Sequence, residues 1–151
     1  MGIHDISNEN QFVYDSSGEA IGFSDWIPGE PSNDGGEGDC VAYWKHWNDQ
    51  DIGWNDRPCD HKTPVVCEGQ ELDGNNKFEE LERLIWITSS KSNDHVFKID
   101  NKIYSFSSKM ANFDSAQDHC AQLGGKLFEP QTRDTYNDVK ANLKALGYQD
   151  W

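Results

Sequence analysis

Residues 29–68 read GEPSNDGGEGDCVAYWKHWNDQDIGWNDRPCDHKTPVVCE and hold the most informative features of the chain. This stretch contains an acidic loop that begins at a proline, two Trp-Asn-Asp triplets and three of the four cysteines of the protein. Cysteines at this density can hold irregular loops in place when they are oxidised to disulfides. The stretch therefore predicts a set of polar loops fixed by covalent cross-links.

The acidic loop and the second triplet supply many side-chain oxygens. The residues that carry them are Glu30, Asn33, Asp34, Glu37, Asp39, Asn55 and Asp56. Carboxylate and amide oxygens are the ligands that a hard cation such as calcium selects. Carboxylates gathered this closely repel one another unless a cation lies among them. The residue types thus indicate a calcium site.

Three spaced motifs in this stretch resemble the carbohydrate-binding half of a C-type lectin domain. They are Glu30-Pro31-Ser32 ten positions before Cys40, Trp54-Asn55-Asp56 followed by Cys59, and Val66-Cys67-Glu68. The first triplet, residues 47–49, lacks a cysteine three residues later and is interpreted as a loop. The resemblance implies an α+β fold with two helices, small antiparallel sheets and long calcium-binding loops.

The two halves of this fold stand in swapped order along the chain. The family's opening strand resembles KIYSFS at residues 102–107, and its first helix resembles FDSAQDHCAQLGGKL at residues 113–127. Joining Trp151 to Met1 would complete a strand that resembles one of the family. The resemblance therefore implies a circular permutant. Its parts would be residues 1–68 as the C-terminal, calcium- and sugar-binding half, 69–97 as a linker, and 98–151 as the N-terminal half.

Apolar spacing predicts three helices. Residues 113–127 place Phe113, Ala116, Cys120 and Leu123 on one face and meet Gly124-Gly125, which stops a helix. Residues 132–146 repeat the pattern with Tyr136, Val139, Leu143 and Leu146. In the linker, Phe78, Leu81, Leu84 and Ile85 have helical spacing behind a cap at Asp73 or Asn75. That segment is expected to be an amphipathic helix, followed by a strand at residues 86–90.

The resemblance also implies which residues bind calcium. The principal set is Glu30, Ser32, Asn33, Glu37, Asn55 and Asp56, and the auxiliary set is Asp5, Glu9, Asp34 and Asp39. A cis peptide bond is expected before Pro31, where cis costs little. Two registers stay open for the loop: either Ser32 supplies an oxygen, or the loop bulges and Asn33 replaces it. For Asp5 and Glu9 the alternative interpretation is a solvated turn.

The sugar would bind through two adjacent hydroxyls that complete the coordination of the calcium ion. The residues implied are Glu30, Ser32, Asn55, Asp56, Trp44 and Trp47, although the two tryptophans can instead belong to the core. Family members with Glu-Pro-Asn generally favour mannose-type hydroxyl pairs, and those with Gln-Pro-Asp favour galactose-type pairs. Glu-Pro-Ser matches neither, and the nearby tryptophans favour a galactose-type mono- or oligosaccharide slightly.

Four cysteines without a Cys-x-x-Cys pair argue for disulfides in an oxidising compartment rather than for zinc. Spacing alone allows three connectivities. The resemblance selects Cys40 with Cys59 and Cys67 with Cys120, and it implies a secreted or cell-surface location.

Charge and hydropathy exclude several other functions. The formal charge is −14, and residues 1–68 carry 14 acidic and 3 basic side chains against 13 and 10 in residues 69–151. Such a surface repels the phosphates of nucleic acids. No apolar run approaches the roughly 18 residues of a membrane span, so membrane insertion is not expected. The oligomeric state is not indicated.

Alternatives to sugar binding remain within the same fold. Calcium-dependent ice-binding domains and protein-binding lectin-like domains share it, and an engineered permuted scaffold could display residues 78–90. No hydrolase order of Ser, His and Asp or of Cys and His is present, nor a His-Glu-x-x-His motif. The chain is therefore not expected to be an enzyme.

Overall fold

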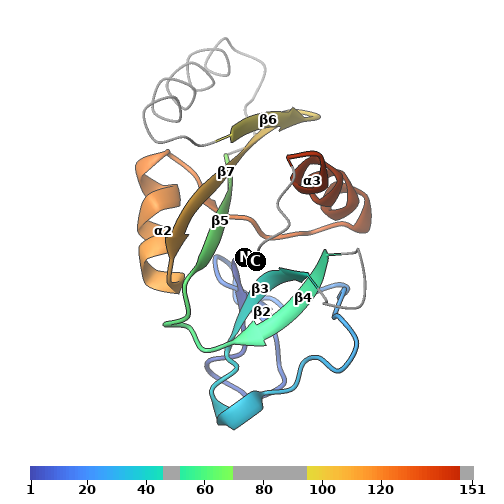
Figure 1. Cartoon of the computed structure of the whole chain (residues 1–151), viewed down its shortest axis with the longest axis vertical. Coiled ribbons are helices and arrows are strands. Elements are labelled where there is room, and N and C mark those ends of the chain that lie inside the picture. Colours follow the sequence, from blue (N-terminus) through green and yellow to red (C-terminus); the bar gives the residue numbers. More distant parts are fainter. Residues whose placement is uncertain (46–51, 70–94, 147–151) are drawn as a thin grey trace.

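The computed structural model describes residues 1–45, 52–69 and 95–146, which form two antiparallel sheets and two helices (Figure 1). In this view the two sheets lie one above the other, and α2 and α3 lie on opposite sides of β5 and β7. Neither helix of this described part is long and apolar enough to cross a bilayer.

The first sheet belongs wholly to the N-terminal segment and has the strand order β2-β1-β3-β4. Its strands are β1 (Ile3–His4), β2 (Val13–Tyr14), β3 (Cys40–Lys45) and β4 (Ile52–Arg57). The register of the β3–β4 pair places Val41 opposite Asp56 and Tyr43 opposite Trp54. The second Trp-Asn-Asp triplet therefore lies in a regular strand, and the acidic loop with the short 3-10 helix η1 (Asp34–Gly36) leads into its partner β3.

The second sheet joins the two ends of the sequence. Its order is β6-β7-β5-β8, with β5 (Thr63–Glu68), β6 (His95–Ile99), β7 (Lys102–Ala111) and β8 (Lys126–Leu127). β5 comes from the N-terminal segment but lies between two strands of the C-terminal segment, with Val66 opposite Phe106 and Cys67 opposite Leu127. The N-terminal segment is thus completed by residues 95–146. The expected linker boundary at residue 97 falls inside β6.

The helices follow their apolar patterns with two corrections. α2 (Phe113–Gln122) begins after Asn112, whose side chain accepts a hydrogen bond from the Ser115 amide. It ends earlier than predicted because Gly124 turns the backbone left-handed at φ 80°. The predicted last residues of this helix instead form β8 and pair with β5.

α3 (Arg133–Ala145) begins after Thr132, which accepts a hydrogen bond from the Thr135 amide. Tyr136, Val139 and Leu143 are buried as predicted. Leu146 is not on the buried face: it follows the last helical residue and is 37% exposed.

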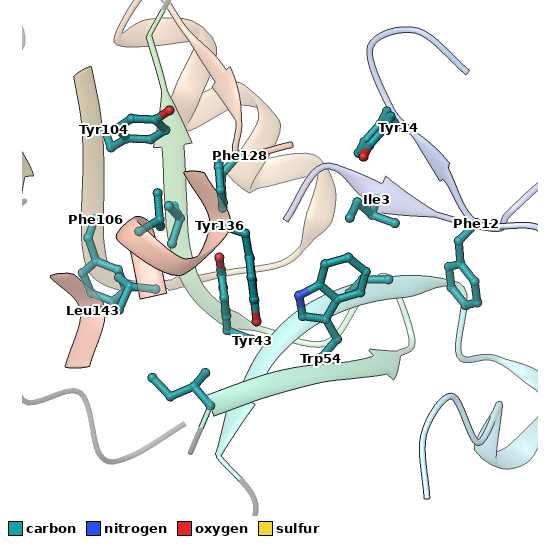
Figure 2. Close-up of a cluster of buried hydrophobic side chains, with 14 residues drawn as sticks. Ile3, Phe12, Tyr14, Tyr43, Trp54, Tyr104, Phe106, Phe128, Tyr136 and Leu143 are labelled. Carbon is teal, nitrogen blue, oxygen red and sulfur yellow. The ribbon is translucent and has the colours of Figure 1, made fainter. Parts of the chain in front are cut away.

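The main core lies between the sheets and takes side chains from both segments (Figure 2). Tyr43 from β3 lies parallel to Tyr136 from α3, with ring centroids 6.0 Å apart. Trp54 meets the same Tyr136 ring edge-on at 5.8 Å and is 1% exposed. Because aromatic side chains bury large areas, this contact between β3, β4 and α3 fixes the strand that carries Asp56.

Two disulfides have the connectivity that the resemblance implied. Cys40 pairs with Cys59, and Cys67 pairs with Cys120. The first closes the chain around β3 and β4, and the second ties β5 to α2. The peptide bond between Glu30 and Pro31 is cis, as predicted.

Several predicted features lie outside the described residues. They are the helix and strand expected within residues 73–90, the triplet at residues 47–49, and the junction of residues 147–151 with Met1. The order of the two halves as a permutation therefore remains a prediction.

Candidate functional site

Asp56 is the centre of a compact hydrogen-bonded cluster. It lies in β4 opposite Val41, is 4% exposed, and its two carboxylate oxygens accept from the Ser32 amide at 2.9 Å and the Asn33 amide at 2.5 Å. The Glu30 carboxylate accepts from the same Ser32 amide, also at 2.9 Å. The two carboxylates therefore converge on one backbone N–H.

The electrostatics of this pair are those of two acids that share a proton. Burial raises the pKa of the Glu30 carboxyl, and its hydrogen bond with Asp56 raises that pKa further. Burial also opposes ionisation of Asp56, but its bonds with Glu30 and with the amides of Ser32 and Asn33 hold its pKa below the usual range. A cation between two such carboxylates can replace the shared proton, so the donor set fits a hard divalent ion.

The loop around the pair is held by Asn33. Its backbone is left-handed (φ 46°, ψ 42°), a conformation that asparagine tolerates better than most residues. The Asn33 side-chain oxygen accepts from the Gly38 amide at 3.0 Å, and its carbonyl accepts from the Gly36 amide at 2.8 Å. Asn33 thus closes the loop, and of its atoms only the backbone N–H reaches Asp56.

Gly38 occupies a place where no side chain fits. A Cβ at this position would lie 2.5 Å from an Asp56 carboxylate oxygen and 3.0 Å from the Asn33 Cα. The acidic residue before it, Glu37, is exposed and does not join the hydrogen-bonded cluster of Glu30 and Asp56. Glu37, which the sequence analysis placed in the principal calcium set, therefore lies apart from this cluster.

Ser32 and Asn55 offer neutral oxygens beside the pair. Ser32 is exposed and its amide lies between the two carboxylates. Asn55 precedes Asp56 in β4, is 7% exposed, and its side chain makes no hydrogen bond among the described residues. Both can supply ligands in addition to the carboxylates.

A second group of acidic residues lies around Asp5, which is 2% exposed. One of its carboxylate oxygens accepts from the Asn10 amide at 2.7 Å, and the other is buried and has no hydrogen-bond partner within the described part of the chain. Burial raises the pKa of Asp5, and the charges of Glu9 and Asp39 raise it further. The Asp5 amide donates to the Asp39 carbonyl at 3.0 Å, which brings the two segments together.

An unpartnered buried carboxylate oxygen is costly unless a proton or a cation compensates it. Of the other predicted auxiliary residues, Glu9 and Asp39 lie near enough for their charges to act on Asp5, and an auxiliary cation site at these residues stays a prediction. Asp34 is exposed in η1 and makes no contact with them.

The described residues contain no group of three or more His, Cys, Asp or Glu side chains placed to hold a metal ion. The candidate site at Glu30 and Asp56 instead combines two carboxylates with neutral oxygens. Calcium accepts such mixed oxygen sets, with six to eight ligands that include carbonyls and waters.

The aromatic candidates differ in their surroundings. Trp44 is half-buried, and the Arg57 guanidinium lies 4.3 Å from the centroid of its ring. One face of this ring is therefore taken by a cation–π contact. Trp47 lies outside the described residues.

Sequence reasoning missed the part that backbone amides play in this site. Asp56 was expected as a calcium ligand, but its hydrogen bonds to residues 32 and 33 also shape the loop. The glycine at position 38, between two acidic residues, was the available signal because it marks a place where the backbone closely approaches another group.

Comparisons with known proteins agree with the motifs. A family model for the lectin C-type domain matches residues 1–69. Salivary C-type lectin 2 of Aedes albopictus is 36% identical over 69 residues, which cover 45% of this chain and 46% of that protein. Pulmonary surfactant-associated protein D of Bos taurus is 35% identical over 68 residues, or 45% of this chain and 17% of that protein.

The chain thus spans less than half the length of either relative. No solved structure matches it. The matched region contains β1 to β5, both disulfide-linked cysteines of the loop, and the cluster of Glu30 and Asp56. Residues 1–69 are therefore similar to the lectin C-type domain.

Proposed function

We propose that this chain binds carbohydrates in a calcium-dependent way at the loop that joins Glu30 to Asp56. The observation that carries the proposal is the convergence of these two carboxylates on the Ser32 amide, within a segment that matches the lectin C-type domain. The similarity to salivary C-type lectin 2 and to pulmonary surfactant-associated protein D supports sugar binding as the class of function.

The residues that would hold calcium are Glu30, Asp56 and Asn55, with an oxygen of Ser32. The ion would supply a positive centre to which two neighbouring sugar hydroxyls can bind. The carboxylates of Glu30 and Asp56 would accept hydrogen bonds from the sugar hydroxyls. The amides of Ser32 and Asn33 keep Asp56 in position for both tasks.

Asn33 and Glu37 have smaller parts in this proposal than the sequence implied. The Asn33 side chain already accepts a bond from Gly38 and serves to close the loop. Glu37 is exposed beside the loop. Of the two registers left open for the loop, we choose the one in which Ser32 supplies the oxygen. Galactose-type and mannose-type sugars both stay candidates.

Residues 95–146 support the site from outside the matched segment. The Asp25 carboxylate, which precedes the loop, accepts hydrogen bonds from Tyr136 at 2.5 Å and from Lys140 at 2.9 Å. The Glu129 carboxylate accepts from the Ser16 hydroxyl at 2.6 Å. We propose that the two segments form one lectin domain whose halves stand in permuted order, in an extracellular protein that its two disulfides suit.

The proposal is tested by binding to immobilised mannose and immobilised galactose. We expect the protein to be retained on at least one resin in calcium and released by EDTA, because the cation links the sugar to the loop. The matched control is the variant Asp114→Ala, which removes an exposed carboxylate on α2, far along the chain from the loop. Retention that persists in EDTA, or no retention on either resin or on a glycan array, would contradict the proposal.

A further inference from the structure

A short segment at the entry to the candidate loop lies against β4. Residues 25–27, the entry segment, form an isolated parallel bridge with Trp54. The Trp54 amide donates to the Asp25 carbonyl at 2.7 Å, and the Trp54 carbonyl accepts from the Ile27 amide at 3.0 Å. The approach is close, since a Cβ at Gly53 would lie 2.6 Å from the Ile27 side chain and 2.8 Å from the Asp25 carbonyl.

The entry segment determines where Glu30 lies. The Glu30 amide donates to the Ile27 carbonyl at 3.0 Å and so closes a turn directly after the entry segment. Beyond this turn, the Ser32 amide donates to the carboxylates of both Glu30 and Asp56. Glu30 therefore lies between one attachment to β4 at Trp54 and a second at Asp56. Because a neutral backbone hydrogen bond contributes little net stability, the first attachment depends on what else holds the entry segment.

Three side chains of α3 hold the entry segment at Asp25. The Asp25 carboxylate accepts from the Tyr136 hydroxyl at 2.5 Å and from the Lys140 ammonium at 2.9 Å, and the Arg133 guanidinium lies 4.0 Å away. Arg133 also donates to the Ser24 carbonyl at 3.1 Å. Hydrogen bonds with a charged partner are about twice as strong as neutral ones. With side chains only 29% and 13% exposed, Asp25 and Lys140 are partly shielded from water.

The same helix is packed against β4. Tyr136 is fully buried and meets the ring of Trp54 edge-on, with centroids 5.8 Å apart (Figure 2). One tyrosine thus contacts β4 through its ring and the entry segment through its hydroxyl. Since packed interiors transmit displacements rather than absorb them, the position of the entry segment on β4 follows the position of α3.

We propose that Asp25 is a positioning residue for the calcium loop, through which α3 sets the affinity for the ion. The inference rests on the proposed function and deepens it, because α3 lies outside the residues that match the lectin C-type domain. The Asp25 carboxylate is engaged by α3, so this residue acts on Glu30 through its backbone. Residues that orient metal ligands from outside the coordination sphere typically change metal affinity by about 10–100-fold when they are replaced.

The test compares two carboxylates that have similar partners. Asp25→Asn keeps the shape of the side chain but loses the charge that attracts Lys140. Glu129→Gln is the matched control: Glu129 is 2% exposed and accepts from the Ser16 hydroxyl at 2.6 Å and from the Lys126 ammonium at 2.7 Å. It also joins the two halves of the chain, but away from the entry segment. Each substitution removes one negative charge, so an effect of net charge would be the same in both.

Calorimetry at a temperature where every variant is folded measures calcium affinity, and guanidinium unfolding in EDTA measures stability. We expect calcium to bind about tenfold more weakly to Asp25→Asn and with wild-type affinity to Glu129→Gln, although both variants lose stability. Lys140→Met should also weaken calcium binding. Because Lys140 acts through Asp25, the double variant should bind calcium no more weakly than Asp25→Asn alone.

Amide hydrogen exchange in EDTA tests the positioning without any ligand. The Asn33 amide, which donates to Asp56, should exchange about tenfold faster in Asp25→Asn than in wild type, since local opening sets its rate. The Phe128 amide donates to the Val66 carbonyl at 2.9 Å and reports on the second sheet. Its exchange should keep the wild-type rate.

Three outcomes overturn the positioning role. They are wild-type calcium affinity in Asp25→Asn, an equal loss of calcium affinity in Glu129→Gln, and an Asn33 amide that exchanges at the same rate in wild type and Asp25→Asn. If wild type binds no calcium, the proposed function fails. The exchange rate of the Asn33 amide then still decides whether Asp25 positions the loop.

Discussion

Replacing Asp56 by alanine should separate the structural and the ligand-binding roles of this carboxylate. In the structure Asp56 is 4% exposed and accepts hydrogen bonds from the amides of Ser32 and Asn33. After the substitution the Ser32 amide still has Glu30 as an acceptor, but the Asn33 amide has none. A buried donor left without a partner costs about 1–3 kcal/mol.

The free energy of unfolding in EDTA should therefore fall by about 1–3 kcal/mol in Asp56→Ala. In Asp56→Asn one side-chain oxygen remains to accept the Asn33 amide, so the loss should be smaller. Guanidinium unfolding curves of the three proteins, recorded without calcium, measure these differences.

Ligand binding should respond differently from stability. Both Asp56→Ala and Asp56→Asn remove the negative charge that would hold the cation, so calcium affinity should fall at least tenfold in each, or about 1.4 kcal/mol. Sugar affinity should fall with it. Calorimetry with calcium, and then with methyl α-mannoside and methyl β-galactoside, measures both quantities.

Asp49→Ala is the matched control because it changes the other Trp-Asn-Asp triplet. It should leave calcium and sugar affinity close to wild type. If Asp56→Ala still binds sugar as wild type does, or if Asp49→Ala is the variant that loses binding, the site belongs to the triplet at residues 47–49 and the reasoning about Asp56 is wrong.

Three further predictions concern charge and cross-links. Asp5→Asn should raise the melting temperature in EDTA, because it removes a buried carboxylate with one oxygen that has no hydrogen-bond partner within the described part of the chain. It should also reduce the additional stabilisation by calcium. Scanning calorimetry in both buffers checks this, and a lower melting temperature in EDTA would contradict it. Replacing both Cys67 and Cys120 by serine should cost about 3–4 kcal/mol of unfolding free energy, since the disulfide closes a sequence separation of 53 residues; a loss below about 1 kcal/mol in chemical unfolding would show that the packing around α2 suffices. Burial raises the pKa of Glu68 against the opposing effect of nearby lysines. The contribution of Glu68 to stability is therefore present below the usual pKa of about 4.3 and is lost as pH rises through the raised value. The unfolding free energy of Glu68→Gln should change less than that of wild type between about pH 4 and pH 7, and the same change with pH in both proteins would refute this.

Much of the fold could be predicted because it follows from local pattern. The apolar spacing of α2 and α3 identifies their buried faces, and Gly124 marks the end of α2. The motif residues around Cys40 and Cys67 led, through their resemblance to a family, to the disulfide connectivity that the structure contains. These features depend on residues close together in sequence or on a strong motif.

The remainder depends on contacts between distant segments, which pattern does not specify. The residues Lys126–Leu127 were expected in a helix, but they pair with β5, which lies about sixty residues earlier in the chain. The separation of Glu37 from the cluster follows from the close approach of Gly38 to Asp56 across the loop. Neither of these has a periodic signal in the sequence.

The central claim is that calcium and sugar bind together at Glu30 and Asp56. Thermodynamic linkage makes this claim directly measurable, because a sugar that binds to the calcium-loaded loop must raise calcium affinity by the same factor as calcium raises sugar affinity. The measurement is a calcium titration by calorimetry in the absence of sugar and at saturating methyl α-mannoside or methyl β-galactoside. We predict tighter calcium binding with at least one of the sugars; identical calcium affinity in the presence and absence of both would contradict the account.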